Sequence, residues 1–216
     1  MFRLIKKNLF IFVIIFASLL TLYVFLARFF NTISFFELIH VLSSGYEEES
    51  LLEIWYKINN KELYVNHLIF PYRWTVYNWF FYEFYSSAYL LVNKIFEVNF
   101  LWFPNLLRIL TLIGTFISAY IFYMIGKILY SSSKLNFFLL IYIFFGLTFG
   151  FWNFTVRPDI FALFFELLAI YTFVKKHNSH KVSYILLTAI LLYISWSFKQ
   201  TSLVTLSTAV GSVLHS

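Results

Sequence analysis

The strongest constraint in this sequence is a succession of apolar runs, several of them long enough to cross a lipid bilayer. A hydrocarbon core of about 30 Å takes about 20 helical residues, and backbone groups in lipid must be satisfied within the segment, which favours helices. Only 12% of the residues are charged, whereas a soluble domain carries about 25%. The chain is therefore predicted to be an all-α, polytopic transmembrane helical bundle. Its predicted binding partners include the lipid bilayer.

Basic residues set the predicted orientation of these runs. Arg3, Lys6 and Lys7 precede the first run, which is too long for a signal-peptide core and is therefore predicted to be an uncleaved helix with a cytoplasmic N-terminus. The last run ends just before Ser216. We therefore expect the chain to be the front part of a larger polytopic architecture or a truncated copy of one. The predicted spans are 9–30, 106–130, 137–154, 160–174, 182–198 and 202–214.

The long hydrophilic stretch 31–73 is predicted to be a loop on the outer face. It holds six of the ten acidic residues of the chain. Within it, Leu51, Trp55 and Ile58 recur at helical spacing, which predicts a short amphipathic helix on the membrane surface. The aromatic segment 74–96 is predicted to be interfacial or re-entrant, because the later basic connections reach the cytoplasmic side only if this segment does not cross. A spanning helix is the alternative, and it would invert the side assigned to the later polar breaks.

Ionisable residues beside lipid cost about 2.5–3.5 kcal/mol each on insertion scales, so they usually face a cavity or mark a function. Three places qualify: the Glu47-Glu48-Glu49 cluster, the Arg157-Pro158-Asp159 break and Lys199-Gln200. The predicted topology puts all three on the outer side. The first two also have a structural interpretation, since adjacent glutamates on a loop are usually solvated and Arg-Pro-Asp is an ordinary tight turn between helices.

Other kinds of site find little support. The chain has no cysteine, which excludes disulfides, thiolate metal sites and a cysteine nucleophile. Its five histidines lack the HExxH spacing, so no metal ligand and no cofactor is assigned, and a role for a divalent metal is left open. The net charge of +6 comes from short clusters beside apolar runs. Such clusters fit the positive-inside rule, and no nucleic-acid partner is expected.

The order of short motifs resembles the N-terminal module of the GT-C superfamily of membrane glycosyltransferases, which includes protein O-mannosyltransferases and aminoarabinose transferases. One helix is followed by an acidic motif in the outer loop, then by a helix that opens with Arg108, and then by basic breaks between the later apolar runs. The quoted motifs are Gly45-Tyr46-Glu47-Glu48-Glu49, Lys61-Glu62-Leu63-Tyr64, Pro71-Tyr72-Arg73-Trp74, Val156-Arg157-Pro158-Asp159 and Phe198-Lys199-Gln200-Thr201.

The resemblance implies an inverting transfer of a sugar from a polyprenyl-phosphate donor to a glycan, lipid or protein acceptor on the outer or lumenal membrane face. The expected location is a bacterial inner membrane. The family's usual acidic motif is Asp-Glu, whereas this sequence has Tyr46-Glu47-Glu48 at that place, so which glutamate is the base stays open. The implied roles are general base for Glu47 or Glu48, donor-phosphate binding for Arg108, Arg157 and Lys199, and support of the cavity for Asp159, Gln200 and Tyr64.

Two alternatives from other classes remain. A transporter or flippase would place its substrate site on broken helices near the bilayer midplane, as the Arg157-Pro158-Asp159 interruption suggests, although no internal repeat is visible. A polytopic protein without catalysis, such as a truncated enzyme, is the other. Neither the sugar nor the acceptor follows from the sequence.

Overall fold

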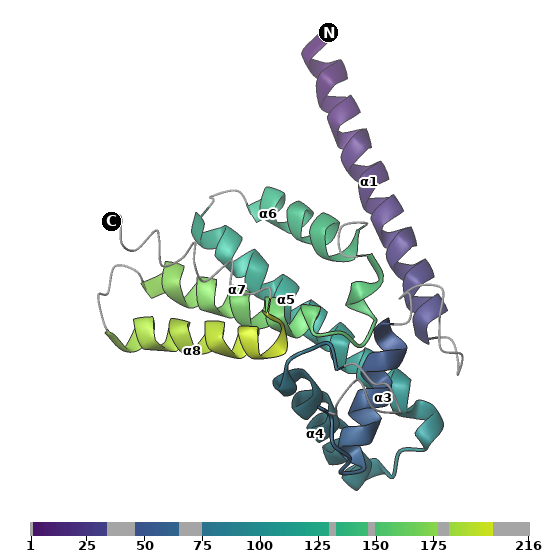
Figure 1. Cartoon of the computed structure of the whole chain (residues 1–216). Coiled ribbons are helices and arrows are strands. Elements are labelled where there is room, and N and C mark those ends of the chain that lie inside the picture. Colours follow the sequence, from purple (N-terminus) through teal and green to yellow (C-terminus); the bar gives the residue numbers. More distant parts are fainter. Residues whose placement is uncertain are drawn as a thin grey trace.

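A computed structural model describes residues 2–33, 46–64, 75–129, 133–146, 150–176 and 182–200. Every regular element in these ranges is helical, in agreement with the predicted all-α class (Figure 1). The predicted span 202–214 and the Pro71–Trp74 motif lie outside them. The elements are α1 (Phe2–Ile33), α3 (Tyr46–Ile58), α4 (Trp79–Phe96), the 3-10 helix η1 (Phe100–Trp102), α5 (Phe103–Leu129), α6 (Ser133–Leu140), the π-helix η2 (Ile141–Phe145), the 3-10 helix η3 (Gly150–Asn153), α7 (Asp159–Lys176) and α8 (Val182–Phe198).

Two helical stretches are long and apolar enough to cross a membrane, Ile11–Phe30 in α1 and Phe100–Leu129 in η1 and α5. α1 extends away from the other helices (Figure 1), and most of its apolar side chains are exposed. A soluble protein rarely leaves so much contiguous apolar surface in water. These two helices point to membrane association, while the full set of spans stays a prediction because the other apolar helices, Asn136–Phe145 and Val182–Phe198, are shorter.

The apolar run 137–154 does not form one continuous helix. α6 passes into the π-helix η2, and the helix ends at Gly146. A Cβ atom at Gly146 would collide with the carbonyl of Tyr142, so only glycine fits this backbone conformation. Arg28 of α1 donates a hydrogen bond to the Gly146 carbonyl at 3.3 Å. A terminal carbonyl that the helix leaves without its usual partner is thereby satisfied from another helix.

α7 packs along both α5 and α8 and joins the apolar helices into one layer (Figure 1). Gly114 of α5 permits the close approach of α7, because a Cβ atom at this position would lie 2.9 Å from the ring of Phe161. On the other side of α7, the Ser195 hydroxyl donates to the carbonyl of Ala162 at 2.7 Å. Both contacts are buried, so the start of α7 is held in place from two sides.

α3 and α4 pack against each other at one end of this layer. Leu51 and Ile54 of α3 are buried in a single cluster with Phe81 and Tyr85 of α4. The apolar spacing that predicts a surface helix therefore marks the side of α3 that faces the protein. α4 is not among the helices that are long and apolar enough to cross a membrane. An interfacial or re-entrant position for it stays the prediction.

Candidate functional site

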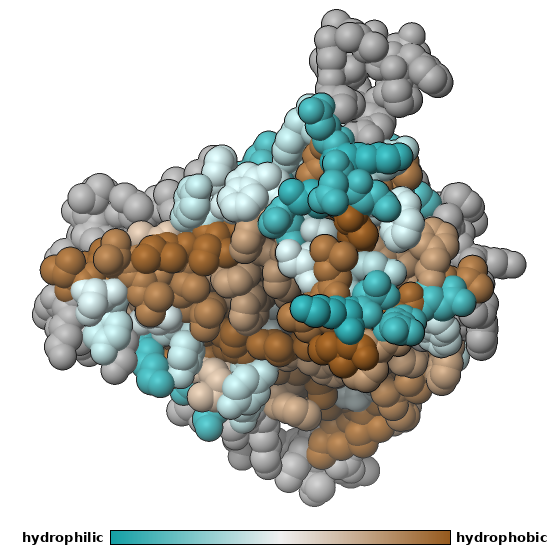
Figure 2. All heavy atoms as spheres, turned by 90° about the horizontal axis from the view of Figure 1, so that it is seen from below, coloured by the Kyte–Doolittle hydropathy of each residue, from teal (hydrophilic) through white to brown (hydrophobic). Residues whose placement is uncertain are grey.

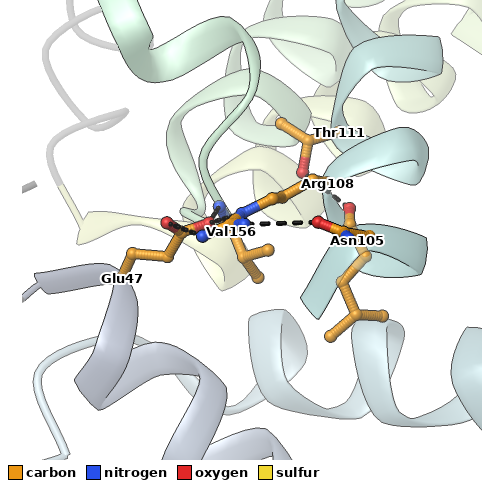
Figure 3. Close-up of polar contacts among 6 residues, drawn as sticks. Glu47, Asn105, Arg108, Thr111 and Val156 are labelled. Atoms are coloured by element: carbon orange, nitrogen blue, oxygen red, sulfur yellow. Dashed lines mark hydrogen bonds and ion pairs between the residues drawn. The ribbon is translucent and has the colours of Figure 1, made fainter. Parts of the chain in front are cut away.

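The centre of the candidate site is a buried ion pair between Glu47, in the first turn of α3, and Arg108, near the start of α5 (Figure 3). Nε of Arg108 donates to Oε1 of Glu47, and Nη2 donates to Oε2, both at 2.9 Å. The side chains are only 2–3% exposed. This two-bond geometry is the strong form of a charge-assisted hydrogen bond, and it keeps the buried pair neutral as a whole.

The same carboxylate also binds the segment that leads into α7. The backbone N–H of Val156 donates to Oε1 of Glu47 at 2.9 Å (Figure 3). Nη1 of Arg108 donates to Oδ1 of Asn105, one turn earlier on α5, at 3.3 Å. One glutamate thus connects α3, α5 and the break before α7. Because it accepts three hydrogen bonds and is almost fully buried, it is poorly placed to take a proton from a substrate.

A second charged cluster is built on Asp159, the first residue of α7. Its Oδ2 accepts a hydrogen bond from Nε of Arg157 at 3.2 Å, and its Oδ1 forms an ion pair with Nζ of Lys199, just beyond α8. The guanidinium of Arg157 lies 5.3 Å from the ring centroid of Trp152, a cation–π distance. Arg157 and Lys199 are partly exposed, with side-chain values of 13% and 28%. Two cations share one carboxylate here, which leaves a formal charge of +1.

Tyr85 of α4 is buried and contacts Thr111, three residues after Arg108 on α5. Its hydroxyl and that of Thr111 are 2.7 Å apart. Since Thr111 donates its proton to the carbonyl of Leu107 at 3.0 Å, Tyr85 must be the donor in the first bond. Burial raises the pKa of Tyr85 above its ordinary value, and the negative charges of Glu47 and Asp159 raise it further. Tyr85 is therefore a neutral hydrogen-bond donor whose pKa depends on the charges of both carboxylates.

Gln200 directly follows Lys199 in the sequence, and its side chain binds Asn78. Its Nε2 donates to Oδ1 of Asn78 at 3.0 Å, and Nδ2 of Asn78 donates to the carbonyl of Trp196 at 2.6 Å. Asn78 precedes α4 without capping it through its side chain. It binds the end of α8 and thereby ties the start of α4 to the segment that carries Lys199.

Tyr64 lies apart from both charged clusters. It is exposed, and its hydroxyl donates to the carbonyl of Tyr77 at 3.2 Å. Partial burial and then the charge of Glu53 raise its pKa. Glu48, next to Glu47 in the first turn of α3, is partly exposed as a residue, whereas Glu47 is buried, although the Oε1 atom of Glu48 is itself buried. The residues predicted from the sequence therefore separate into a buried pair, a partly exposed charged cluster and Tyr64.

Several contacts of the site were not predicted from the sequence, although Val156 belongs to one of the quoted motifs. The Val156 N–H carries no sequence signal, because every residue other than proline has one. Asn105 stands three residues before Arg108, the spacing at which helical neighbours meet, and this polar residue in an apolar run was a usable signal. Tyr85 was hidden among the many aromatic residues of its segment. No group of three or more His, Asp or Glu side chains in the described ranges is placed to hold a metal ion.

Comparison of the chain with protein-family models, with curated proteins and with solved structures found no match.

Proposed function

We propose that the chain is a multi-pass membrane glycosyltransferase that moves a sugar from a polyprenyl-phosphate donor to an acceptor at the membrane surface, as its resemblance to the GT-C superfamily implies. One observation carries the proposal. Five charged residues from distant parts of an apolar chain gather where α3, α5, α7 and α8 meet: Glu47, Arg108, Arg157, Asp159 and Lys199. Charged groups beside apolar helices are costly, and such a gathering usually has a function.

The Asp159 cluster suits the phosphate of a lipid carrier. Its formal charge is +1, and both Arg157 and Lys199 are partly open to an incoming ligand. An arginine offers a planar set of donors to phosphate oxygens, and a lysine offers a point charge. As the bond to the anomeric carbon breaks, these cations stabilise the charge on the departing phosphate in a site with little water. Asp159 holds the two cations together before the donor binds.

Inversion at the anomeric carbon requires a single displacement, in which a base takes the proton of the acceptor hydroxyl as the oxygen attacks. A positioned carboxylate contributes about 10²- to 10⁴-fold to such a step. We assign this role to Glu48 rather than to Glu47, because Glu47 is buried and accepts three hydrogen bonds. Glu47 and Arg108 hold α3 on α5 and on the break before α7. Glu48 and Arg157 thereby keep fixed positions relative to each other.

The test is transfer of label from a panel of radiolabelled polyprenyl-phosphate sugars in membranes that contain the chain. We expect Glu48→Gln to abolish turnover at an unchanged protein level, and Lys199→Gln to raise the KM for the donor more than it lowers kcat. Glu49→Gln is the matched control, because it removes the same charge from an exposed neighbour on α3. Wild-type rates in both Glu48→Gln and Lys199→Gln would refute the assigned roles.

The interrupted helix of α6 and η2 favours a second candidate, transport of a lipid-linked substrate. Discontinuous helices line the substrate sites of many transporters, and the break at Gly146 is of that kind. The two functions differ in the product. A transferase releases free polyprenyl phosphate from the donor, whereas a flippase moves the labelled donor across the bilayer intact. Thin-layer separation of the recovered lipid in the same assay distinguishes them.

A further inference from the structure

An exposed apolar surface surrounds the turn between α4 and α5, which we name the α4–α5 corner. The exposed fraction of its side chains reaches 63% for Leu91, 64% for Ile95 and 73% for Phe96. In Figure 2, apolar side chains are seen to lie open beside hydrophilic ones on the side of the molecule that carries α3 and α4. A contiguous apolar surface of this kind marks a site of interaction with protein or membrane. The corner consists of Leu90, Leu91, Ile95, Phe96, Leu101 and Trp102.

The backbone of the corner is fixed by local hydrogen bonds. Glu97 adopts the left-handed conformation, with φ of 48°, and its N–H donates to the carbonyl of Asn93 at 2.9 Å, which ends α4. Two residues later the side chain of Asn99 accepts a hydrogen bond from the N–H of Leu101 at 3.0 Å. The exposed apolar side chains are therefore held outward by a defined turn.

The ring of Phe103 anchors the corner from the protein side. Phe103 is buried, and its ring centroid lies 5.0 Å from that of Tyr89 and 5.5 Å from that of Trp55. α3, α4 and the start of α5 thus meet on one aromatic contact. The outward side of the corner cannot turn inward without breaking this packing.

The corner is continuous with a helix that is apolar enough to cross a membrane. That stretch begins at Phe100, directly before the corner residues Leu101 and Trp102, and its exposed side runs on through Ile109, Ile113 and Tyr120. Trp102 stands at the entry, the position that tryptophan favours at a membrane boundary. Lys94 is exposed among the apolar residues, and a lysine can bury its stem in lipid while its ammonium reaches the headgroups.

We propose that the α4–α5 corner is inserted into one boundary of the lipid bilayer, with Leu91, Ile95 and Phe96 among the acyl chains and Lys94 at the lipid phosphates. The corner then acts as a membrane anchor that fixes the α3–α4 pair, and with it Glu47 and Glu48, at headgroup depth. This inference depends on α5 crossing the membrane and not on the transfer of a sugar.

The test uses single-cysteine variants, since the chain has no native cysteine. Phe96→Cys and Leu91→Cys report on the corner, Ile113→Cys on the middle of α5, and exposed Glu62→Cys on water. Each variant carries a nitroxide label in the full chain in nanodiscs. Collision with oxygen, which collects in the hydrocarbon core, is compared with collision with a water-soluble nickel chelate. We expect the oxygen-to-nickel ratio at both corner positions to fall between those at Ile113 and Glu62.

A ratio at the corner equal to that at Glu62 places the corner in water and overturns the proposal. A ratio equal to that at Ile113 also overturns it, because α4 then reaches the bilayer centre. Labels shielded from both reagents would mean that protein covers the corner instead of lipid. If Ile113 itself reports water, the crossing by α5 fails and the anchor fails with it, whatever the transfer assay shows.

Discussion

Removal of the Glu47 charge is the perturbation for which the structure gives the sharpest expectation. Glu47→Gln keeps the shape of the side chain and its acceptor for the Val156 N–H, but it turns an amide N–H₂ or a neutral oxygen toward the guanidinium of Arg108. The carboxylate accepts two bonds from Arg108 and one from Val156, each at 2.9 Å. Bonds to charged groups contribute about 1.5–3 kcal/mol each and are not additive. A buried charge left alone costs about 3–5 kcal/mol, which is the expected loss of unfolding free energy.

An exposed ion pair in the same chain supplies the control. Nζ of Lys57 on α3 lies 2.7 Å from Oε2 of Glu83 on α4, but these side chains are 37% and 45% exposed. A solvated pair of this kind contributes about 0–1 kcal/mol. Lys57→Met should therefore change the unfolding free energy by about 1 kcal/mol or less. The difference between the two variants measures burial together with the additional hydrogen bonds that Glu47 accepts.

The measurement is unfolding of the purified chain in mixed micelles with increasing SDS, followed by tryptophan fluorescence. Glu47→Gln, Arg108→Met and the double variant complete a cycle. In the double variant both charges are gone and the Gln oxygen still accepts from Val156, so we expect it to be more stable than Glu47→Gln alone. Additive losses, or a Glu47→Gln loss no larger than that of Lys57→Met, would show that the buried pair does not act as a unit.

Three further variants test the packing and titration of the site. Gly114→Leu should lower the unfolding free energy by about 1–3 kcal/mol through collision with Phe161, and Gly114→Ala should lower it by less. Equal stability of the wild type and both variants in the SDS titration would contradict the close approach of α5 and α7. Asn78→Ala loses its bond to the Trp196 carbonyl and should cost about 1 kcal/mol, with faster amide hydrogen exchange at the end of α8; unchanged exchange there argues against this tie. Tyr85 has a raised pKa, so above about pH 10 the unfolded chain loses this proton more readily than the folded one, and stability falls as pH rises. Tyr85→Phe should lower the Tm at pH 9 but flatten its decline from pH 9 to pH 11, and a slope equal to that of the wild type would remove Tyr85 from the titration.

Much of the local structure was predictable from the sequence. The period and length of the apolar runs determine helices, because a backbone among apolar side chains must satisfy its hydrogen bonds within its own segment. The run Val182–Phe198, for example, forms α8 with those bounds. The polar interruptions are equally visible, since a charge beside an apolar run stands out. Arg108, Arg157, Asp159 and Lys199 are therefore candidate site residues on the strength of the sequence alone.

Only the tertiary structure decided which of these residues meet. Glu47 and Arg108 are 61 positions apart, Glu47 and Val156 are 109 apart, and Asp159 and Lys199 are 40 apart. No periodic pattern carries information across such separations. The break at Gly146 was hidden for a related reason, because the run remains apolar through it and the partner of its carbonyl belongs to α1. The sequence determined where helices form and where charge interrupts them, whereas close packing of those helices chose the partner of each charge.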